Sequence, residues 1–206
     1  MADAVSDRSA ILQAKKAIRS AILQRRDALD EVTRSRASAL ITARLLDLPQ
    51  FQNARYVLAY LSFGTELETD PFIQTLRARG CALALPKVDR ETRRLEIYRV
   101  ADPLTDTVAG VWGIREPDPS RCERARLDDI DAVLVPGVAF TPACDRLGYG
   151  GGFYDGLIGN WPARPRLIAG AYDVQVVAQV PMDADDQPID CVVTESSDFS
   201  RSSTTR

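Results

Sequence analysis

The sequence of 206 residues contains no histidine. Imidazole is the side chain whose charge ordinarily changes near neutral pH, and it is a common zinc ligand. Its absence excludes a Ser-His-Asp or Cys-His nucleophile, a histidine-ligated zinc site and a histidine proton shuttle. Much of the usual chemistry of hydrolases is therefore closed to this chain.

Cysteines and long apolar runs are also scarce. Cys81, Cys122, Cys144 and Cys191 show no C-x-x-C spacing, which argues against a metal knuckle or a disulfide scaffold. No apolar run approaches the ~18 residues of a membrane span, and the acidic start lacks the apolar core of a secretion signal. We therefore expect a cytoplasmic protein in a reducing compartment, with no membrane partner.

Positive charge is not in excess. The formal net charge is −3, and only three of the 26 basic residues, Lys15, Lys16 and Lys87, are lysines. Such a chain offers no general cationic field for a nucleic acid. Its length suits one domain, which we place at residues 1–195 and expect to be a monomer, followed by a polar tail at 196–206 that we expect to be disordered.

Hydrophobic periodicity predicts an alternation of helices and strands. Apolar residues at helical spacing indicate helices over 8–28, 30–49 and 69–79. Short apolar runs indicate strands at 56–61, 81–86, 95–100, 167–172 and 191–194, and in the run 132–140, where Pro136-Gly137 marks the end of the strand. We therefore predict a three-layer α/β/α sandwich with a mostly parallel central sheet, preceded by two N-terminal helices.

A cluster of glycines follows one of these strands. Half of the twelve glycines fall between Gly148 and Gly159, just before a helical pattern. Glycines there let successive backbone N–H groups point at one anion, and a helix N-terminus adds partial positive charge. Arg146, at the edge of the window, can bind phosphate oxygens through two parallel hydrogen bonds. The window matches neither the P-loop nor the dinucleotide fingerprint, so we interpret it as a nonstandard nucleotide loop; the alternative is a glycine linker without a ligand.

Carboxylates lie next to this window. Asp155 closes it and falls on the first turn of the following helix, and the segment 183–190 is acidic. A carboxylate beside a bound phosphate is repelled unless a cation lies between them, which suggests Mg²⁺. This ion needs only one or two protein carboxylates when phosphate and water complete its octahedron. The alternatives are a helix-terminus charge at Asp155 and a solvated acidic loop.

Five segments, in order along the chain, resemble the 5-formyltetrahydrofolate cyclo-ligases, also called methenyltetrahydrofolate synthetases. They are Lys15-Lys16-Ala17-Ile18-Arg19, Glu66-Leu67-Glu68-Thr69, the segment 111–117, the glycine window 146–155 and the segment 186–195. The resemblance implies that Mg-ATP phosphorylates the formyl oxygen of 5-formyltetrahydrofolate, after which N10 attacks the activated carbon and phosphate leaves, giving 5,10-methenyltetrahydrofolate. Such phosphoryl transfer needs no histidine, because it depends mainly on positioning and charge neutralisation.

The resemblance also implies roles for individual residues. The implied ATP-binding residues are Lys15, Arg19, Arg146, Leu147, Gly148, Tyr149, Gly150, Gly151, Gly152, Phe153 and Tyr154, with Arg146 as the catalytic residue. The implied folate-binding residues are Leu61, Glu66, Trp112, Tyr149, Gly150, Gly151, Gly152 and Phe153. Glu66 would pair with the amino-pteridine edge, and Asp155 with Asp186 would hold Mg²⁺. We expect Arg146 to lie on an exposed loop, so that Arg146→Ala removes turnover with little loss of stability.

The chain departs from the family pattern at three positions. Gly151 stands where many members have lysine, Tyr149 where some have arginine, and Asp185 where some have histidine. A larger share of charge stabilisation should then fall on Arg146, Lys15 and Mg²⁺.

Other interpretations remain open. The chain could be a noncatalytic nucleotide- or RNA-binding relative, or a sugar-phosphate isomerase or CoA-transferase that uses Glu66 as acid-base or nucleophile. At the level of residues, Trp112 could belong to the core, and Lys15 with Arg19 could form a solvated helix face.

Overall fold

The computed structural model describes residues 2–110 and 113–201, with side chains from residue 8 onward. Its α-helices are α1 (Ala2–Asp27), α2 (Glu31–Asp47), α3 (Pro49–Gln52), α4 (Asp70–Ala78) and α5 (Phe153–Gly159), and its 3₁₀ turns include η2 (Leu127–Asp129) and η3 (Asp173–Gln175). Asp30 caps α2, because its carboxylate accepts the Thr33 N–H at 2.9 Å. The predicted second helix is thus confirmed, except that it breaks at Leu48 and resumes as α3.

One mixed sheet forms the centre of the molecule, with the strand order β12-β11-β10-β7-β1-β2-β3-β6. The strands are β1 (Tyr56–Leu58), β2 (Ala82–Asp89), β3 (Arg94–Val100), β6 (Glu123–Arg124), β7 (Ala132–Leu134), β10 (Arg166–Gly170), β11 (Cys191–Val193) and β12 (Asp198–Ser200). The inner run from β11 to β2 is parallel, and the pairings outside it are antiparallel. The predicted, mostly parallel sheet is therefore confirmed.

Two small ladders accompany this sheet, and neither was predicted. They are the pairs β4 (Thr107–Ala109) with β5 (Arg115–Pro117) and β8 (Ala139–Phe140) with β9 (Arg146–Leu147). The run 132–140 divides at Pro136-Gly137, so its first part joins the central sheet as β7 and its last residues form β8. The β8-β9 hairpin then leads directly into the glycine window.

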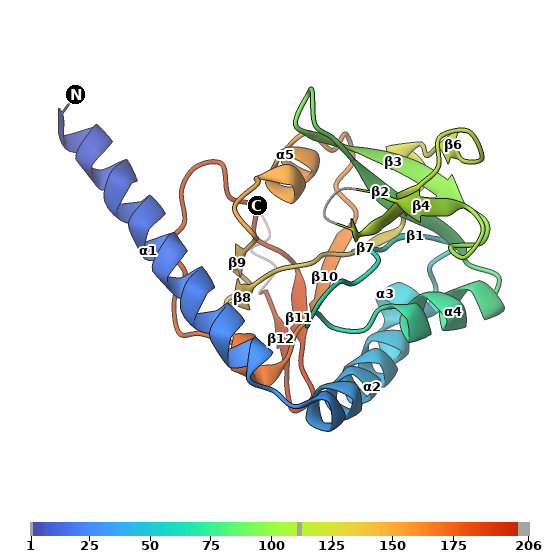
Figure 1. Cartoon of the computed structure of the whole chain (residues 1–206), viewed down its shortest axis with the longest axis horizontal. Coiled ribbons are helices and arrows are strands. Elements are labelled where there is room, and N and C mark those ends of the chain that lie inside the picture. Colours follow the sequence, from blue (N-terminus) through green and yellow to red (C-terminus); the bar gives the residue numbers. More distant parts are fainter. Residues whose placement is uncertain (1, 111–112, 202–206) are drawn as a thin grey trace.

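Side chains of the inner strands alternate between two cores. In β7, Ala132 and Leu134 face the core beneath α2, α3 and α4, whereas Val133 faces the core that contains Ile158 of α5. Figure 1 shows α2, α3 and α4 below the sheet and α5 above it. The structure thus has the three layers that the sequence predicts.

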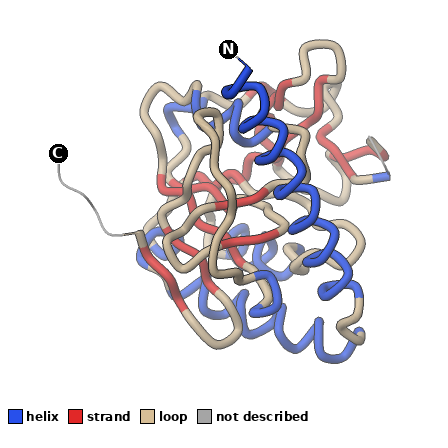
Figure 2. The backbone as a smooth tube through the Cα atoms, turned by 90° about the vertical axis from the view of Figure 1, so that its left-hand side faces the viewer, coloured by secondary structure: helices blue, strands red, loops and turns tan. Residues whose placement is uncertain are grey.

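Helix α1 lies outside these layers. It packs its apolar residues on the β8-β9 hairpin through a third core cluster in which Ile22 meets Val138 and Leu147. Figure 2 shows α1 running along one side of the molecule. No helix of the described residues combines the length and the apolar character needed to cross a membrane.

The expectation of a disordered tail from residue 196 is wrong for its first part. Residues 198–200 form β12, which pairs with β11, and Phe199 packs against the core on the α5 side of the sheet. Alternation of a single apolar residue between polar neighbours is too weak a signal to mark an edge strand. Residues 202–206 lie outside the described part of the chain.

Candidate active site

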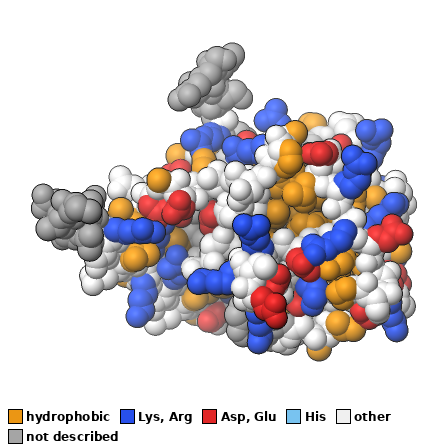
Figure 3. All heavy atoms as spheres, turned by 90° about the horizontal axis from the view of Figure 1, so that it is seen from above, with side chains coloured by type: hydrophobic (Ala, Val, Ile, Leu, Met, Phe, Trp, Pro, Cys, Tyr) orange, Lys and Arg blue, Asp and Glu red, His pale blue; other side chains and the backbone are white. Residues whose placement is uncertain are grey.

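A cavity of about 430 Å³ opens between α5, the β2-β3 hairpin and the segment after β1. Figure 3 views the molecule from this side, where hydrophobic side chains gather with charged side chains around them. The lining is mostly apolar and aromatic, with a few ionisable groups: Tyr60, Leu61, Phe63, Glu66, Leu85, Pro86, Val88, Leu95, Ile114, Arg115, Glu116, Pro136, Arg146, Gly148, Tyr149, Gly151, Gly152, Phe153, Tyr154 and Asp155. Such a lining suits an organic ligand with a flat apolar body and a few polar groups.

Arg146 lies in β9 at one wall of this cavity and is only 2% exposed. Its Nη1 donates to the Pro136 carbonyl oxygen at 3.2 Å, and its Nη2 donates to Asp155 Oδ1 at 2.7 Å. The expectation of an exposed loop arginine is therefore wrong. The β8-β9 hairpin, which the sequence does not reveal, carries the side chain inward.

The glycine window is built to let the chain approach Arg146 closely. A Cβ on Gly148 would lie 2.8 Å from Arg146 Nη1, a distance that real Cβ atoms do not adopt. Gly150 has φ of 101°, in the left-handed region that glycine enters at no steric cost. The following helix, α5, has only seven residues, so the backbone N–H groups of the loop and the neighbouring cations, rather than the helix, are the candidate anion-binding groups.

Three cations project from α1 toward the body of the protein, at the helical positions 15, 19 and 26. Lys15 is 4% exposed, and its Nζ donates to Asp183 Oδ2 at 2.7 Å and to Asp186 Oδ2. Burial alone lowers the pKa of Lys15, but the hydrogen bonds to these carboxylates outweigh it and raise the pKa above its usual value. Arg19 Nε donates to the Gly148 carbonyl oxygen at 2.7 Å, and burial lowers the pKa of Arg19. These two residues therefore do not form a merely solvated face.

The two carboxylates predicted to hold a metal belong to α5 and to the acidic loop, which contact each other. Asp155 Oδ1 accepts the Gln187 N–H at 3.1 Å, which joins it to the loop that carries Asp186. Within the described residues, Asp155 Oδ2 and Asp186 Oδ1 accept no protein hydrogen bond, and no cluster of three acidic or thiol side chains forms. A pair of carboxylates with one free oxygen each fits Mg²⁺ that takes its remaining ligands from phosphate and water.

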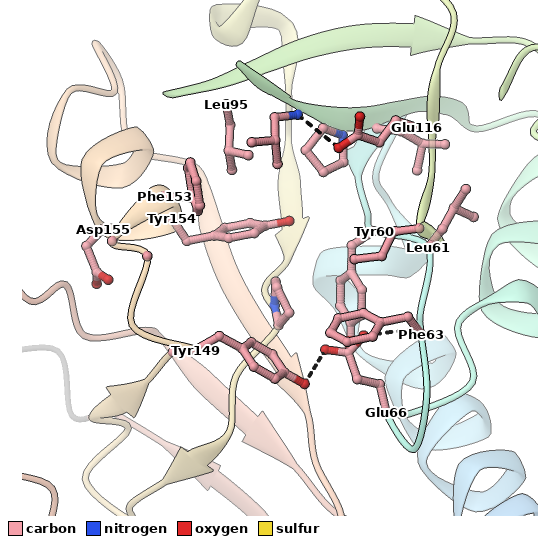
Figure 4. Close-up of a pocket in the computed structure, with 18 of the residues that line it drawn as sticks. Tyr60, Leu61, Phe63, Glu66, Leu95, Glu116, Tyr149, Phe153, Tyr154 and Asp155 are labelled. Carbon is pink, nitrogen blue, oxygen red and sulfur yellow. Dashed lines mark hydrogen bonds between the residues drawn. The ribbon is translucent and has the colours of Figure 1, made fainter. Parts of the chain in front are cut away.

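Glu66 lies at the opposite end of the cavity and is 6% exposed (Figure 4). Its Oε1 accepts the Tyr149 hydroxyl at 2.6 Å, and its Oε2 accepts the Phe63 N–H at 3.1 Å. Burial raises the pKa of Glu66, while the hydrogen bonds from Tyr149 and Phe63 and the charge of Arg26 oppose that rise. The Glu66 carboxylate therefore has a fixed orientation, and its neighbours offset part of the pKa rise that burial causes.

The structure places the other predicted residues unequally. Leu61, Phe153 and Tyr154 line the cavity, whereas Leu147 is 2% exposed in the core beneath α1. Gly150 approaches Arg19 instead of the cavity, since its Cβ would lie 3.4 Å from Arg19 Cζ. Trp112, predicted to contact folate, lies outside the described residues.

Two residues near the cavity were not singled out from the sequence. Arg26 is 4% exposed and donates to the Tyr149 hydroxyl, and its place seven residues after Arg19 on one helical face is the signal that could have revealed it. Glu116 is 4% exposed, lines the far end of the cavity, and accepts the Val88 N–H at 3.2 Å and the Lys87 ammonium at 3.5 Å. It lay within a segment used for the resemblance, but nothing in the sequence showed that it is buried.

The model of the 5-formyltetrahydrofolate cyclo-ligase family matches residues 11–195, which include every described part of this site. The chain belongs to that family. The cyclo-ligase of Escherichia coli K12 is 31% identical over 173 residues, which cover 84% of this chain and 95% of the relative. The mouse cyclo-ligase is 27% identical over 192 residues, covering 89% of this chain and 95% of the relative.

A solved structure of 5,10-methenyltetrahydrofolate synthetase from Aquifex aeolicus has the same fold as this cyclo-ligase family member. The TM-score is 0.80 at 32% identity, and the match covers 93% of this chain and 95% of that one. The enzyme from Mycoplasma pneumoniae matches with a TM-score of 0.71 at 23% identity over 88% of this chain and 98% of that one, which adds support for the fold. The family that the sequence resembles is therefore confirmed.

Proposed function

We propose that this chain couples ATP cleavage to the cyclisation of 5-formyltetrahydrofolate, with 5,10-methenyltetrahydrofolate, ADP and phosphate as products. The family match and the relatives named for this activity support the reaction and its use of ATP. The observation that carries the proposal is a single cavity that joins a buried carboxylate, apolar walls and the glycine window with Arg146.

The phosphates of ATP would lie on the side of the glycine window. Arg146 and the loop N–H groups supply hydrogen-bond donors there, and Lys15 and Arg19 add two cations from α1. Lys15 already faces Asp183 and Asp186, and Arg146 faces Asp155. The site therefore holds paired positive and negative side chains. The cationic side chains can bind the phosphates, while the carboxylates can bind the counter-cation that comes with them.

The folate would occupy the apolar part of the cavity. Glu66 accepts the paired N–H groups of the amino-pteridine edge, because each of its oxygens has one acceptor position left after its bond to Tyr149 or Phe63. Leu61, Phe63 and Phe153 offer flat apolar contact beside that edge. The formyl group then points toward Arg146, where the phosphate is delivered.

The chemistry requires no covalent bond to the protein. The formyl oxygen attacks the γ-phosphorus as the bond to ADP breaks, and N10 then attacks the formyl carbon, loses its proton and expels phosphate. Arg146 stabilises charge on the transferring phosphoryl group, a contribution commonly worth about 3 kcal/mol of barrier. The mostly apolar lining limits the water beside the activated intermediate.

We also propose that Asp155 and Asp186 hold Mg²⁺ through their free oxygens. The ion would neutralise phosphate charge when it is bound. The chain's own residues, Lys15 and Arg146, keep these carboxylates in place until then.

We further propose a monomer that works in the cytoplasm. The four cysteines are buried and unpaired, which suits a reducing compartment. Size-exclusion chromatography at working concentration should give one species near the mass of a single chain.

The decisive experiment mixes the purified chain with Mg-ATP and 5-formyltetrahydrofolate and follows absorbance in the methenyl-folate band. We expect the absorbance to grow, with one ADP released per methenyl group formed. Samples without ATP, or with a non-hydrolysable ATP analogue, should stay flat. Absence of growth in the complete mixture, with both substrates shown to be intact, would refute the proposed function.

A further inference from the structure

A series of hydrogen bonds links α1 to the end of the cavity where Glu66 lies. Arg26 Nη1 donates to the Tyr149 hydroxyl at 2.8 Å, and that hydroxyl donates its own proton to Glu66 Oε1 at 2.6 Å. Tyr149 therefore accepts from a cation and donates to an anion, which is the full hydrogen-bonding capacity of one phenol in this arrangement. The three residues are far apart in sequence and meet only in the folded chain.

Arg26 is held firmly in this chain. The residue is 4% exposed, and its Nε donates to Thr65 Oγ1 at 3.0 Å. Thr65 in turn donates to Asp27 Oδ1 at 2.5 Å. Asp27, the neighbour of Arg26 on α1, therefore helps to fix the position of Thr65. Because a buried cation costs desolvation free energy unless it is compensated, the hydrogen bonds to Thr65 and Tyr149 and the nearby charge of Glu66 must offset the burial of Arg26.

Arg26 itself does not line the cavity, but Glu66 and Tyr149 do. In Figure 4, Tyr149 points from the glycine window toward Glu66, on the segment after β1, across the lower end of the cavity. The Tyr149 ring rests against the Phe63 ring, with centroids 5.6 Å apart. Tyr149 thus has one fixed orientation. Because its hydroxyl is hydrogen-bonded to both Arg26 and Glu66, a change at Arg26 alters the hydrogen bond that the carboxylate accepts.

We propose that Arg26 is a positioning residue that acts through Tyr149 to keep the Glu66 carboxylate ionised and aimed at the amino-pteridine edge of the folate. This inference rests on the proposed function and adds the residue that keeps the buried Glu66 able to accept hydrogen bonds. An ionised carboxylate accepts both N–H groups of that edge, whereas a protonated one offers a donor where the edge also has a donor. Loss of the Arg26 side chain should weaken folate binding and leave ATP binding unchanged.

Charge around Glu66 supports this assignment. The titratable groups that face it from the elements packed around it are Arg26 of α1, Tyr149 of the glycine window, Tyr60 after β1 and Tyr154 of α5. The tyrosines carry no charge near neutral pH, since burial raises the pKa of Tyr60, Tyr149 and Tyr154 above the usual value. Among these groups Arg26 is the cation, and its charge lowers the pKa of Glu66 against the effect of burial.

The first test measures the affinity of the full chain for 5-formyltetrahydrofolate, without ATP, as a function of pH. For Arg26→Met we expect affinity to fall at least about tenfold at neutral pH and its loss on acidification to begin at least about one pH unit higher than in the wild type. Arg26→Lys, which keeps the charge, should restore much of the affinity. The KM for ATP should change less than about twofold, since Arg26 lies away from the phosphate side.

Arg25→Met is the matched control, because Arg25 is the preceding residue on α1 and its side chain is exposed. It should bind both substrates as the wild type does. If Arg26→Met keeps the wild-type pH profile and affinity, the positioning role is overturned. If instead the wild type binds no 5-formyltetrahydrofolate, the proposed function fails first.

The second test asks whether the residues act in series. Tyr149 is 41% exposed, so Tyr149→Phe should fold even if Arg26→Met is unstable. It removes the hydrogen bond to Glu66 while leaving the ring on Phe63, and it should also weaken folate binding and shift its pH dependence upward. The double variant Arg26→Met/Tyr149→Phe should lose less affinity than the product of the two single losses, because part of the effect of Arg26 passes through its hydrogen bond to Tyr149. Effects that multiply would contradict the relay.

Discussion

Arg146 shows how one side chain combines stability and chemistry at this site. It is 2% exposed and satisfies both the Pro136 carbonyl oxygen and the Asp155 carboxylate, while it also lines the cavity. Its Nε is buried without a protein partner among the described residues, so this N–H is one of the guanidinium donors that the protein leaves unused. A residue placed in this way contributes to folding before any substrate arrives.

We predict that Arg146→Ala lowers kcat at least about a hundredfold and also destabilises the fold. Turnover falls because the phosphoryl group loses a charged donor. The free energy of unfolding falls by about 2–3 kcal/mol, because Asp155 loses its cation and Pro136 its donor. Chemical denaturation beside steady-state kinetics would check both parts, with Arg126→Ala, whose side chain is 79% exposed, as the control. Unchanged stability would mean that the buried pairing contributes nothing.

At the scale of elements, the conformation of the loop between β9 and α5 depends on the close approach of its backbone to the Arg146 side chain. A Cβ on Gly148 would collide with Arg146 Nη1, whereas a Cβ on Gly156 within α5 would meet nothing within 4 Å. Two glycines in the same window thus have opposite roles: one makes room for the guanidinium, and the other only weakens a helix.

We therefore predict opposite effects for two glycine-to-alanine variants. Gly148→Ala should lower kcat/KM at least about tenfold, because the displaced guanidinium no longer meets the phosphate. Gly156→Ala should keep activity and raise the free energy of unfolding by up to about 1 kcal/mol, because alanine favours helix. Kinetics and thermal unfolding of both variants check this, and equal behaviour would contradict it.

Helix α1 carries three of the cations on which the proposed site depends. It carries Lys15, Arg19 and Arg26 into the site, yet its apolar attachment is a small cluster around Ile22. That cluster is separate from the two cores of the sheet. The position of these three cations of the proposed site therefore depends in part on a modest apolar contact.

For Ile22→Ala we expect a loss of about 2–4 kcal/mol of stability, or local release of α1. The KM values for both ATP and folate should then rise together, because the phosphate-side cations and Arg26 move as one helix. Leu12→Ala, at a 55% exposed position of the same helix, is the control and should change little. Hydrogen exchange along α1 would separate local release from global loss, and protection equal to that of the wild type with unchanged KM values would refute the dependence.

At the scale of the whole molecule, the site is assembled from segments spread along the chain. Lys15 of α1 meets Asp186 across 171 positions, and Tyr149 meets Glu66 across 83. Bound substrates would connect α1, the segment after β1, the glycine window and the acidic loop. Ligands that bind only this assembled state must stabilise it by mass action.

We predict that Mg-ATP at about one hundred times its Kd raises the melting temperature by about 5–10 °C. ATP with a chelator in place of Mg²⁺ should give a clearly smaller shift, because phosphate then meets Asp155 and Asp186 without a cation between them. Differential scanning fluorimetry with Mg²⁺ alone as the control measures this. Equal shifts with and without Mg²⁺ would remove these carboxylates from the metal site.

The sequence alone determined the order and class of the longer helices and of the inner sheet strands, and it determined the family. Apolar periodicity is a local property, so it revealed α2, α4 and the inner parallel strands, and the glycine window gave the specific resemblance. It also named the side chains on which the proposed site depends, such as Glu66 and Arg146. Their roles in binding and catalysis stay predictions.

Only the tertiary structure decided which of those side chains are buried and what each one faces. Burial of Arg146 depends on the β8-β9 hairpin, and the edge strand β12 exists because β11 offers it hydrogen-bond partners. The contact of Arg26 with Tyr149 joins residues 123 positions apart. No local pattern encodes such a contact, because its free energy comes from desolvating and pairing groups that meet only when the whole chain has folded.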